Sequence, residues 1–187
     1  MDCCYIGIDL GSTTTKAVFL DEQERIMGRG ITNSRSNYEL ACQVAREEAE
    51  INARFGLLRR TLEASERIGE LAEPLMAVLA CNHALAQHLE QLQALDAECR
   101  ACAQAHDLPA TEQAGIEQAL ARIFAALRTQ AELDFFPGSA AASDFFRDLA
   151  TSHYLQQAEQ VTRELPVSFD RLVGLFDAAI IRVENHS

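Results

Sequence analysis

The sequence predicts an α+β fold, in which a three-stranded antiparallel meander at the N-terminus precedes a mainly α-helical bundle. Between residues 5 and 33, short runs of alternating apolar and polar residues are separated by turn sequences, which is typical of strands. After Ser34, apolar residues recur at helical spacing. We therefore expect a sheet region over residues 1–35 and a helical region over residues 36–187.

The composition is that of a globular protein and argues against several classes of partner. Hydrophobic residues make up 48% of the 187 residues and charged residues 24%. The net charge of -12 would repel nucleic acid and anionic membranes. The sequence has neither a membrane-spanning apolar run nor a signal-peptide pattern at its start. We expect a cytoplasmic protein with no nucleic-acid or membrane partner, whose six cysteines are reduced thiols.

The three strands are expected at Tyr5 to Leu10, Thr15 to Leu20 and Arg25 to Thr32, joined by the turns "GST" and "DEQE". Alternation in the first strand is expected to direct one set of apolar side chains toward the core, namely Ile6, Ile8 and Leu10. Gly7 and Asp9 then lie on the opposite face, where Gly7 has no side chain and so leaves room for a ligand that interacts with Asp9. The sequence therefore predicts a cleft on that face.

The first two helices are predicted from apolar stripes. Ser36 has capping-box spacing to Glu39, and the helix behind it carries a stripe of Leu40, Val44, Ile51, Phe55, Leu58 and Leu62. Glu50 and Arg54 have the spacing of an ion pair on its solvated face, which also carries Glu47 and Glu48. Pro74 either kinks this helix or starts a second one, with the stripe Leu75, Val78, Leu85, Leu89, Leu92 and Cys99.

Three further helices are expected in the remainder. The third carries Ile116, Leu120, Ile123 and Leu127. The fourth begins near Ser143 as its cap and runs to about Leu165, and the last follows Pro166 and Ser168 with the stripe Leu172, Phe176, Ile180 and Val183. Because the connections are short, these helices are expected to pack as an antiparallel bundle.

The turn "GSTTTK" is the first candidate site. Serine and threonine hydroxyls beside open N–H groups at Gly11, Ser12 and Thr13 can surround phosphate oxygens, and Lys16 adds positive charge. Asp9, at the end of the first strand, is placed to orient a hydrated magnesium ion. A P-loop is excluded, because no second glycine precedes the lysine and a strand follows it. The alternative is that this segment is only a β-turn.

Other chemically reactive residues are interpreted as structural. Cys99 and Cys102 share a helix face, but one such pair supplies only half of a tetrahedral metal site, so we expect them to fill the helix seam. The five histidines are scattered and are expected at the surface or at helix ends: His83, His88, His106, His153 and His186.

The residues around the turn also carry a resemblance. "IGIDLGSTTTKAVFLD" resembles the first phosphate motif of the superfamily of sugar kinases, heat-shock chaperones and actin. The later stretch "RGITNSRSNYELACQVAREEAEINARF" is similar to the ATP-binding A subunits of ATP-dependent benzoyl-CoA reductases. The resemblance implies that residues 1–35 belong to a ribonuclease-H-like, actin-like ATPase lobe. The helical remainder fits an extra segment that the shorter activators of 2-hydroxyacyl-CoA dehydratases lack.

The resemblance also implies site residues, cofactors and partners. Gly11, Ser12, Thr13 and Thr14 would approach the phosphates of ATP, with Lys16 nearby and Asp9 acting through magnesium and water. ATP hydrolysis would drive electrons from ferredoxin, through an iron-sulfur cluster shared by paired ATPase subunits, to the subunits that reduce the aromatic ring of benzoyl-CoA. The implied partners are ferredoxin and the other reductase subunits, including the paralogous ATPase subunit.

The sequence departs from the family pattern in its later part. It has no second phosphate motif, no cysteine pair in a glycine-rich turn and no late "GG" adenosine motif. The chain thus looks like an N-terminal portion of the subunit that holds no catalytic residue and no iron-sulfur cluster, and it is expected to be inactive alone. Two alternatives stay open: a dehydratase activator, which would resume alternating strands and helices, and a non-catalytic helical interaction module. A homodimer through the helices or the exposed sheet edge also stays open.

Overall fold

The computed structural model describes residues 3–34, 37–105, 108–141 and 145–186. They fall into two compact units, Met1–Met76 and Ala77–Ser187. The first unit contains β1 (Tyr5–Leu10), β2 (Thr14–Leu20), β3 (Ile26–Asn33), α1 (Tyr38–Glu63) and the short 3-10 helix η1 (Gly69–Leu71). Helix α2 (Ala72–Gln104) begins in that unit, and the second unit continues with α3 (Ala110–Asp134), α4 (Phe146–Val161) and α5 (Phe169–His186). The α+β fold class is therefore confirmed.

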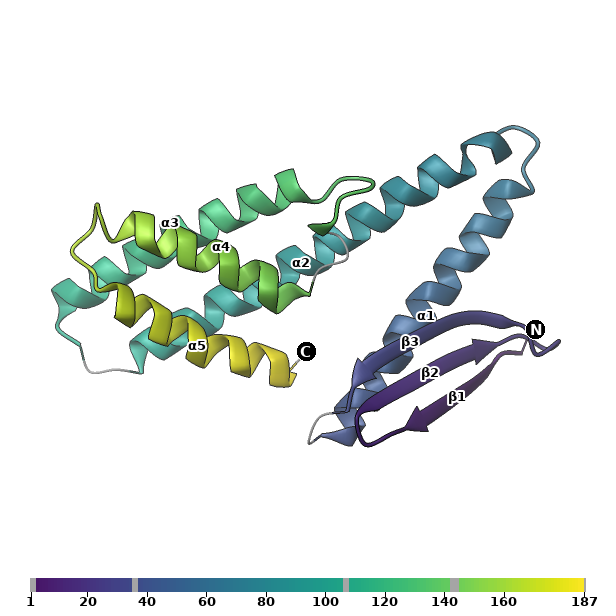
Figure 1. Cartoon of the computed structure of the whole chain (residues 1–187), viewed down its shortest axis with the longest axis horizontal. Coiled ribbons are helices and arrows are strands. Elements are labelled where there is room, and N and C mark those ends of the chain that lie inside the picture. Colours follow the sequence, from purple (N-terminus) through teal and green to yellow (C-terminus); the bar gives the residue numbers. More distant parts are fainter. Residues whose placement is uncertain (1–2, 35–36, 106–107, 142–144, 187) are drawn as a thin grey trace. The chain divides into compact units, whose positions relative to one another are not determined.

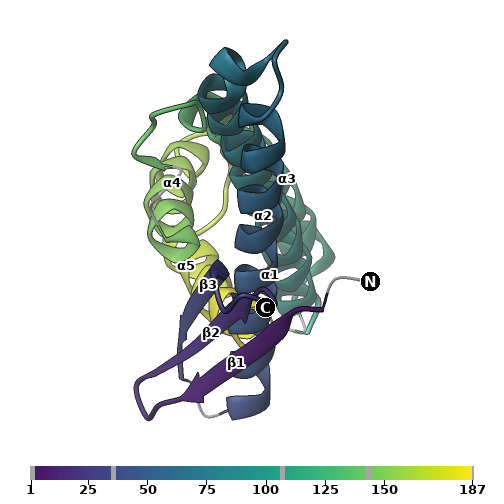
Figure 2. The ribbon, with the colours of Figure 1, turned by 90° about the vertical axis from the view of Figure 1, so that its right-hand side faces the viewer.

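The three strands form an antiparallel sheet in the order β1-β2-β3, as Figures 1 and 2 show. The register aligns Ile8 with Ala17 and Gly30, and the next row aligns Asp9 with Lys16 and Ile31. Because neighbours across strands share a face, these two rows lie on opposite faces of the sheet. The face that carries Ala17 packs against α1, and we call the face that carries Asp9 and Lys16 the open face.

Helix α1 packs on the sheet through alanines and not through the predicted apolar stripe. Its buried residues are Ala41, Ala45, Ala49 and Ala53. They lie against Gly28 and Gly30 of β3, where a Cβ atom would come within 2.1 Å of Ala49 O and 2.0 Å of Ala45 O, respectively. Small residues on both sides thus allow the two backbones to approach closely. The larger side chains of the predicted stripe are at best half-buried, and Leu58 is exposed.

The predicted burial of the β1 side chains is wrong. Ile6, Ile8 and Leu10 pair with Phe19, Ala17 and Thr15, so they do point to the face that packs on α1. They nevertheless remain 42%, 43% and 51% exposed. The buried cluster around α1 consists of side chains of β2 and α1, because the helix lies over β2 and β3 and only reaches the margin of β1. Helix α1 therefore covers the β3 side of the sheet and leaves the β1 side largely uncovered.

The edge formed by β3 is satisfied by polar side chains of α1. Ile31 N donates to Glu48 Oε2 at 2.8 Å, and Asn52 Nδ2 donates to Arg29 O at 2.7 Å. Glu48 is exposed, as predicted for the solvated face of this helix, and its contact with the strand is an additional role. The predicted ion pair between Glu50 and Arg54 is present on the same helix. Helix α1 thus both covers one face of the sheet and caps one of its edges.

The second unit has a single core to which all of its helices contribute, and Figure 1 shows α3, α4 and α5 lying alongside one another. The predicted stripes of the third and the last helix are confirmed, because all their members are buried: Ile116, Leu120, Ile123, Leu127, Leu172, Phe176, Ile180 and Val183. Pro74 lies in the first turn of α2, so it starts that helix and does not kink α1. Proline is tolerated there because no helical N–H is lost.

Helix starts are less well predicted than the helices themselves. Asn37 caps α1 by accepting from Leu40 N at 3.1 Å, whereas Ser36, the predicted cap, lies outside the described residues. Ser143 likewise lies outside them, and α4 begins at Phe146. Helix α1 groups with the sheet in the first unit, although the sequence assigned it to the helical region, and the boundary at residue 35 stays a prediction. Within the described residues, no helix is both long and apolar enough to traverse a bilayer.

Candidate functional site

The turn between β1 and β2 is held by hydrogen bonds to its carbonyl groups. Gly11 N donates to Thr14 O at 3.1 Å, and Ser34 N, just after β3, donates to Thr13 O at 2.8 Å. The Ser34 hydroxyl donates to Gly11 O at 2.6 Å. The carbonyls of Gly11, Thr13 and Thr14 are therefore all engaged within the protein.

One backbone N–H group of the turn is hydrogen-bonded within the protein, whereas two others have no acceptor among the described residues. The N–H of Gly11, which was expected to be open, is already used by Thr14 O, and this corrects the sequence-based expectation. Over the described part of the chain, the N–H groups of Ser12 and Thr13 have no protein acceptor, and both residues are exposed. A turn in which three carbonyls are already hydrogen-bonded and two successive N–H groups have no acceptor within the described residues is suited to an anion.

Gly11 is required by the tightness of this turn. A Cβ atom at this position would lie 2.7 Å from Thr14 O, closer than carbon and oxygen approach in folded proteins. The conflicting atom belongs to the backbone of the same turn and cannot move away cheaply. Gly11 therefore sets the backbone path that exposes the next two N–H groups.

The remaining predicted side chains lie beside the turn on the open face. Asp9 and Lys16 are direct cross-strand neighbours, and both are exposed. Thr14 lies two residues before Lys16 on β2 and so points to the same face. The structure thus brings together all six predicted residues, Asp9, Gly11, Ser12, Thr13, Thr14 and Lys16.

The fourth hydroxyl of the run has a different role. Thr15 points toward α1, is fully buried, and its Oγ1 lies 2.9 Å from Ser34 Oγ. Sequence reasoning did not assign Ser34 or Thr15 to the site. The alternation of β2 could have singled out Thr15 as inward-facing, but Ser34 is 23 residues from Gly11 and only the meander brings them together.

These groups can bind a polyphosphate from one side. N–H groups and hydroxyls donate to phosphate oxygens, and an ammonium group adds a strongly hydrated positive charge. Within the described residues, no cluster of three or more His, Cys, Asp or Glu side chains is arranged around a metal ion. Asp9 offers one exposed carboxylate beside the turn, and magnesium commonly takes only one or two carboxylates and keeps several waters.

The buried cysteines belong to the helical core. Cys99 and Cys102 are 0% and 5% exposed and are packed among the apolar side chains of the second unit. Burial raises the pKa of the Cys99 thiol well above its ordinary value, and the neighbouring Cys102 acts in the same direction. A thiol that resists ionisation is a poor nucleophile and a poor metal ligand.

The prediction for the histidines is wrong at His88. Its ring is 6% exposed and lies in the core of the second unit. His153 is partly buried, with its Nε2 3.5 Å from Asp134 Oδ2. His106 and the side chain of His186 lie outside the described part.

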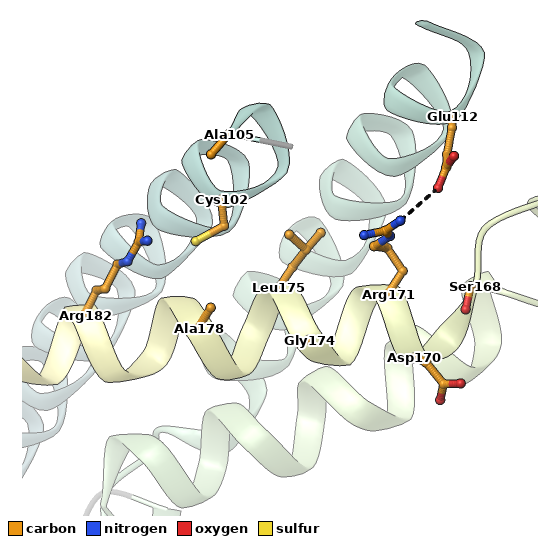
Figure 3. A pocket seen from close by; sticks show the side chains of 10 residues that line it. All are labelled: Cys102, Ala105, Glu112, Ser168, Asp170, Arg171, Gly174, Leu175, Ala178 and Arg182. Carbon is orange, nitrogen blue, oxygen red and sulfur yellow. Dashed lines mark ion pairs between the residues drawn. The ribbon is translucent and has the colours of Figure 1, made fainter. Parts of the chain in front are cut away.

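A groove of about 650 Å³ lies in the second unit, and none of the residues predicted for the phosphate turn lines it. Figure 3 shows its floor along α5, with Gly174, Leu175 and Ala178, and its two arginines. Arg171 lies 3.6 Å from Glu112, and Arg182 lies 3.4 Å from Glu98. Both guanidinium groups already have carboxylate partners, so these two arginines add no uncompensated positive charge to the groove.

The three-stranded meander followed by mostly helical structure is consistent with the N-terminal region of an actin-like ATPase. The model of the BadF/BadG/BcrA/BcrD ATPase family matches residues 6–135 of the 187. The match covers more than half of the chain, and the chain therefore belongs to this ATPase family. Neither the curated proteins nor the solved structures contain a match.

Proposed function

We propose that the chain binds Mg-ATP at the β1–β2 turn as part of the A subunit of an ATP-dependent benzoyl-CoA reductase. The observation that supports ATP binding is the turn itself, with three carbonyls engaged and the N–H groups of Ser12 and Thr13 left without an acceptor among the described residues. Family membership supports the nucleotide. The reductase assignment is supported by the similarity of the stretch from Arg29 to Phe55 to such subunits.

In this proposal each residue of the turn has a defined task. The N–H groups of Ser12 and Thr13 donate to phosphate oxygens, and the exposed hydroxyls of the same residues add further donors. Lys16 neutralises phosphate charge from the open face, where Asp9, its cross-strand neighbour, orients water on the magnesium ion. Magnesium supplies charge neutralisation of the phosphates when it is bound.

The proposed partners follow from the same assignment. The chain would work with the paralogous ATPase subunit, the ring-reducing subunits and ferredoxin, and the iron-sulfur cluster would be held between the paired ATPase subunits. The second candidate function is that of an ATPase activator of a 2-hydroxyacyl-CoA dehydratase. It is less favoured, because such an activator should resume alternating strands and helices, whereas every regular element described after β3 is helical.

A nucleotide titration of the whole chain tests the ATP part. Titration with a magnesium-bound non-hydrolysable ATP analogue, followed by NMR, is expected to shift the amide signals of Ser12 and Thr13. Lys16→Ala should weaken binding by about tenfold, the effect of losing one charged contact. Arg25→Ala is the matched control, because Arg25 is also exposed on the hairpin but pairs with Asp21 at the other end of β2.

Absence of any shift in these amides at millimolar analogue would contradict nucleotide binding and favour the helical interaction module. The reductase part has a separate test in the organism. Deletion of the gene is expected to abolish anaerobic growth on benzoate and to leave growth on succinate unchanged. Unimpaired growth on benzoate would contradict the reductase assignment while leaving ATP binding intact.

A further inference from the structure

Ser34 makes three contacts that tie the end of β3 to the candidate phosphate turn. Its N–H donates to Thr13 O at 2.8 Å, and its hydroxyl donates to Gly11 O at 2.6 Å. The same hydroxyl oxygen lies 2.9 Å from Thr15 Oγ1. Ser34 thus reaches the turn from the far side of β2, because β3 ends at Asn33, opposite Thr14.

The direction of the hydroxyl contacts is fixed by proton count. A carbonyl oxygen only accepts, so the single hydroxyl proton of Ser34 is used on Gly11 O. The contact between Thr15 and Ser34 can then form only if Thr15 donates. The result is a chain of two bonds, from Thr15 through Ser34 to Gly11 O, in which each bond polarises the next.

This chain lies behind the N–H groups that would meet a phosphate. Thr15 is fully buried and Ser34 is partly buried, so both act from the protein side of the turn. Gly11 O and Thr13 O are the acceptors on either side of Ser12. If they were free to rotate outward, their negative partial charge would oppose an anion at the exposed N–H groups of Ser12 and Thr13.

We propose that Ser34 is a positioning residue for the phosphate turn: it holds the carbonyls of Gly11 and Thr13 away from a nucleotide phosphate, and the Ser12 N–H, which shares a peptide plane with the Gly11 carbonyl, thereby faces that phosphate. This inference rests on the proposed ATP binding. Thr15 assists by donating to the Ser34 hydroxyl. Ser34 itself does not touch the phosphate, so its effect is on the affinity of the turn.

The test measures the affinity of the whole chain for the magnesium-bound non-hydrolysable ATP analogue from the amide shifts of Ser12 and Thr13. Ser34→Ala keeps the backbone bond but removes the hydroxyl, and it is expected to raise the Kd about fivefold to tenfold, the effect of losing the hydrogen bond to Gly11 O together with the one accepted from Thr15. Ser34→Thr restores the hydroxyl and should bring the Kd back to within about twofold of the original value.

Thr15→Val removes the upstream donor at nearly constant shape, and it is expected to raise the Kd about twofold to threefold. Because Thr15 acts only through Ser34, the double variant should bind as weakly as Ser34→Ala alone and no weaker. Ser139→Ala is the matched control. Ser139 also donates its hydroxyl to a backbone carbonyl, that of Asp134, but it does so in the second unit.

The outcomes separate this inference from the proposed function. If the analogue shifts the amide signals of Ser12 and Thr13 in the original protein but Ser34→Ala binds it with the same Kd, the positioning role is overturned and ATP binding stands. If the original protein itself does not bind, both fail. If Ser34→Ala disturbs the signals of Ala17 and Phe19 in the sheet, Thr15→Val takes its place, and an unchanged Kd in that variant overturns the inference.

Discussion

His88 lies in the core of the second unit between two phenylalanine rings. Its ring centroid is 5.0 Å from that of Phe135 and 5.2 Å from that of Phe146. Burial lowers the pKa of His88, and the nearby His153 lowers it further, while Asp134 opposes them. The folded protein therefore favours the neutral imidazole over a pH range in which the unfolded chain is protonated.

We expect the stability of the second unit to fall as the pH drops below about 6.5, the ordinary pKa of histidine. The sign follows because a base with a lowered folded-state pKa binds fewer protons in the folded state than in the unfolded state. Thermal melting followed by circular dichroism between pH 7.5 and pH 5 would measure the effect.

His88→Phe should melt with a smaller dependence on pH than the original protein, because it keeps a ring between Phe135 and Phe146 but cannot be protonated. An equally steep dependence in this variant would show that His88 is not responsible for it.

At the level of elements, the packing of α1 on β3 depends on two glycines. A Cβ on Gly30 would come within 2.0 Å of Ala45 O and 2.7 Å of Ala49 N, and all these atoms are backbone. Gly30→Ala is therefore expected to destabilise the first unit by roughly 2 to 3 kcal/mol, since the helix must move away from the sheet. Urea unfolding of the whole chain, followed at the amides of the sheet, would measure this loss.

Gly7→Ala is the matched control for that experiment. Gly7 also lies in a strand, but a Cβ there would meet nothing within 4 Å. The substitution should change the free energy of unfolding by less than about 0.5 kcal/mol. Equal effects of the two substitutions would mean that backbone propensity, and not contact with α1, governs these positions.

The outer edge of β1 is a candidate site of pairing with a second copy of the protein. Arg29 O and Ile31 N point away from β2 and bond to α1. Because the direction of backbone N–H and C=O groups alternates along each strand, the register then directs the N–H and C=O groups of Ile6, Ile8 and Leu10 away from β2, toward the free edge of β1. Their side chains are also exposed. A second copy could pair with this edge around Ile8, which would place Ile6 opposite Leu10 and Asp9 opposite Gly7, so that no like charges meet.

On this basis we expect the protein to associate as concentration rises, and Ile8→Lys to keep it monomeric. Ile31→Lys is the control, because Ile31 is 56% exposed on β3, whose edge is already capped by Glu48. Sedimentation velocity over a range of concentrations would compare the three proteins. A monomer at all concentrations in the original protein would contradict pairing through β1.

At the scale of the whole molecule, local patterns predicted the elements better than their packing. Period-2 alternation found the strands, and the stripes of α3 and α5 identified their buried residues, because those helices pack through large apolar side chains. The same reasoning chose the wrong side of α1. There the contact is made by alanines against glycines, and a helical stripe of small residues carries little hydrophobic signal.

The candidate site was predictable as far as it is contiguous in sequence. Asp9 to Lys16 follow one another along the hairpin, so their side chains could be assigned before the fold was known. Ser34 could not be assigned, because its contact with Gly11 depends on how three strands fold back on each other. His88 was likewise misassigned, since its burial depends on the rings of Phe135 and Phe146 from other parts of the second unit.

In the proposed function the candidate site meets a nucleotide from one side, and this limits what the chain can do alone. The groups proposed to bind phosphate all come from the β1–β2 turn and the adjoining strands, whereas phosphoryl transfer requires charge stabilisation from several sides and a residue that orients the attacking water. We therefore expect the 187-residue chain to bind Mg-ATP weakly and to release phosphate no faster than Lys16→Ala does. A coupled phosphate assay on both purified proteins makes the comparison, and steady release that is lost in Lys16→Ala would mean that this turn supports hydrolysis without a partner.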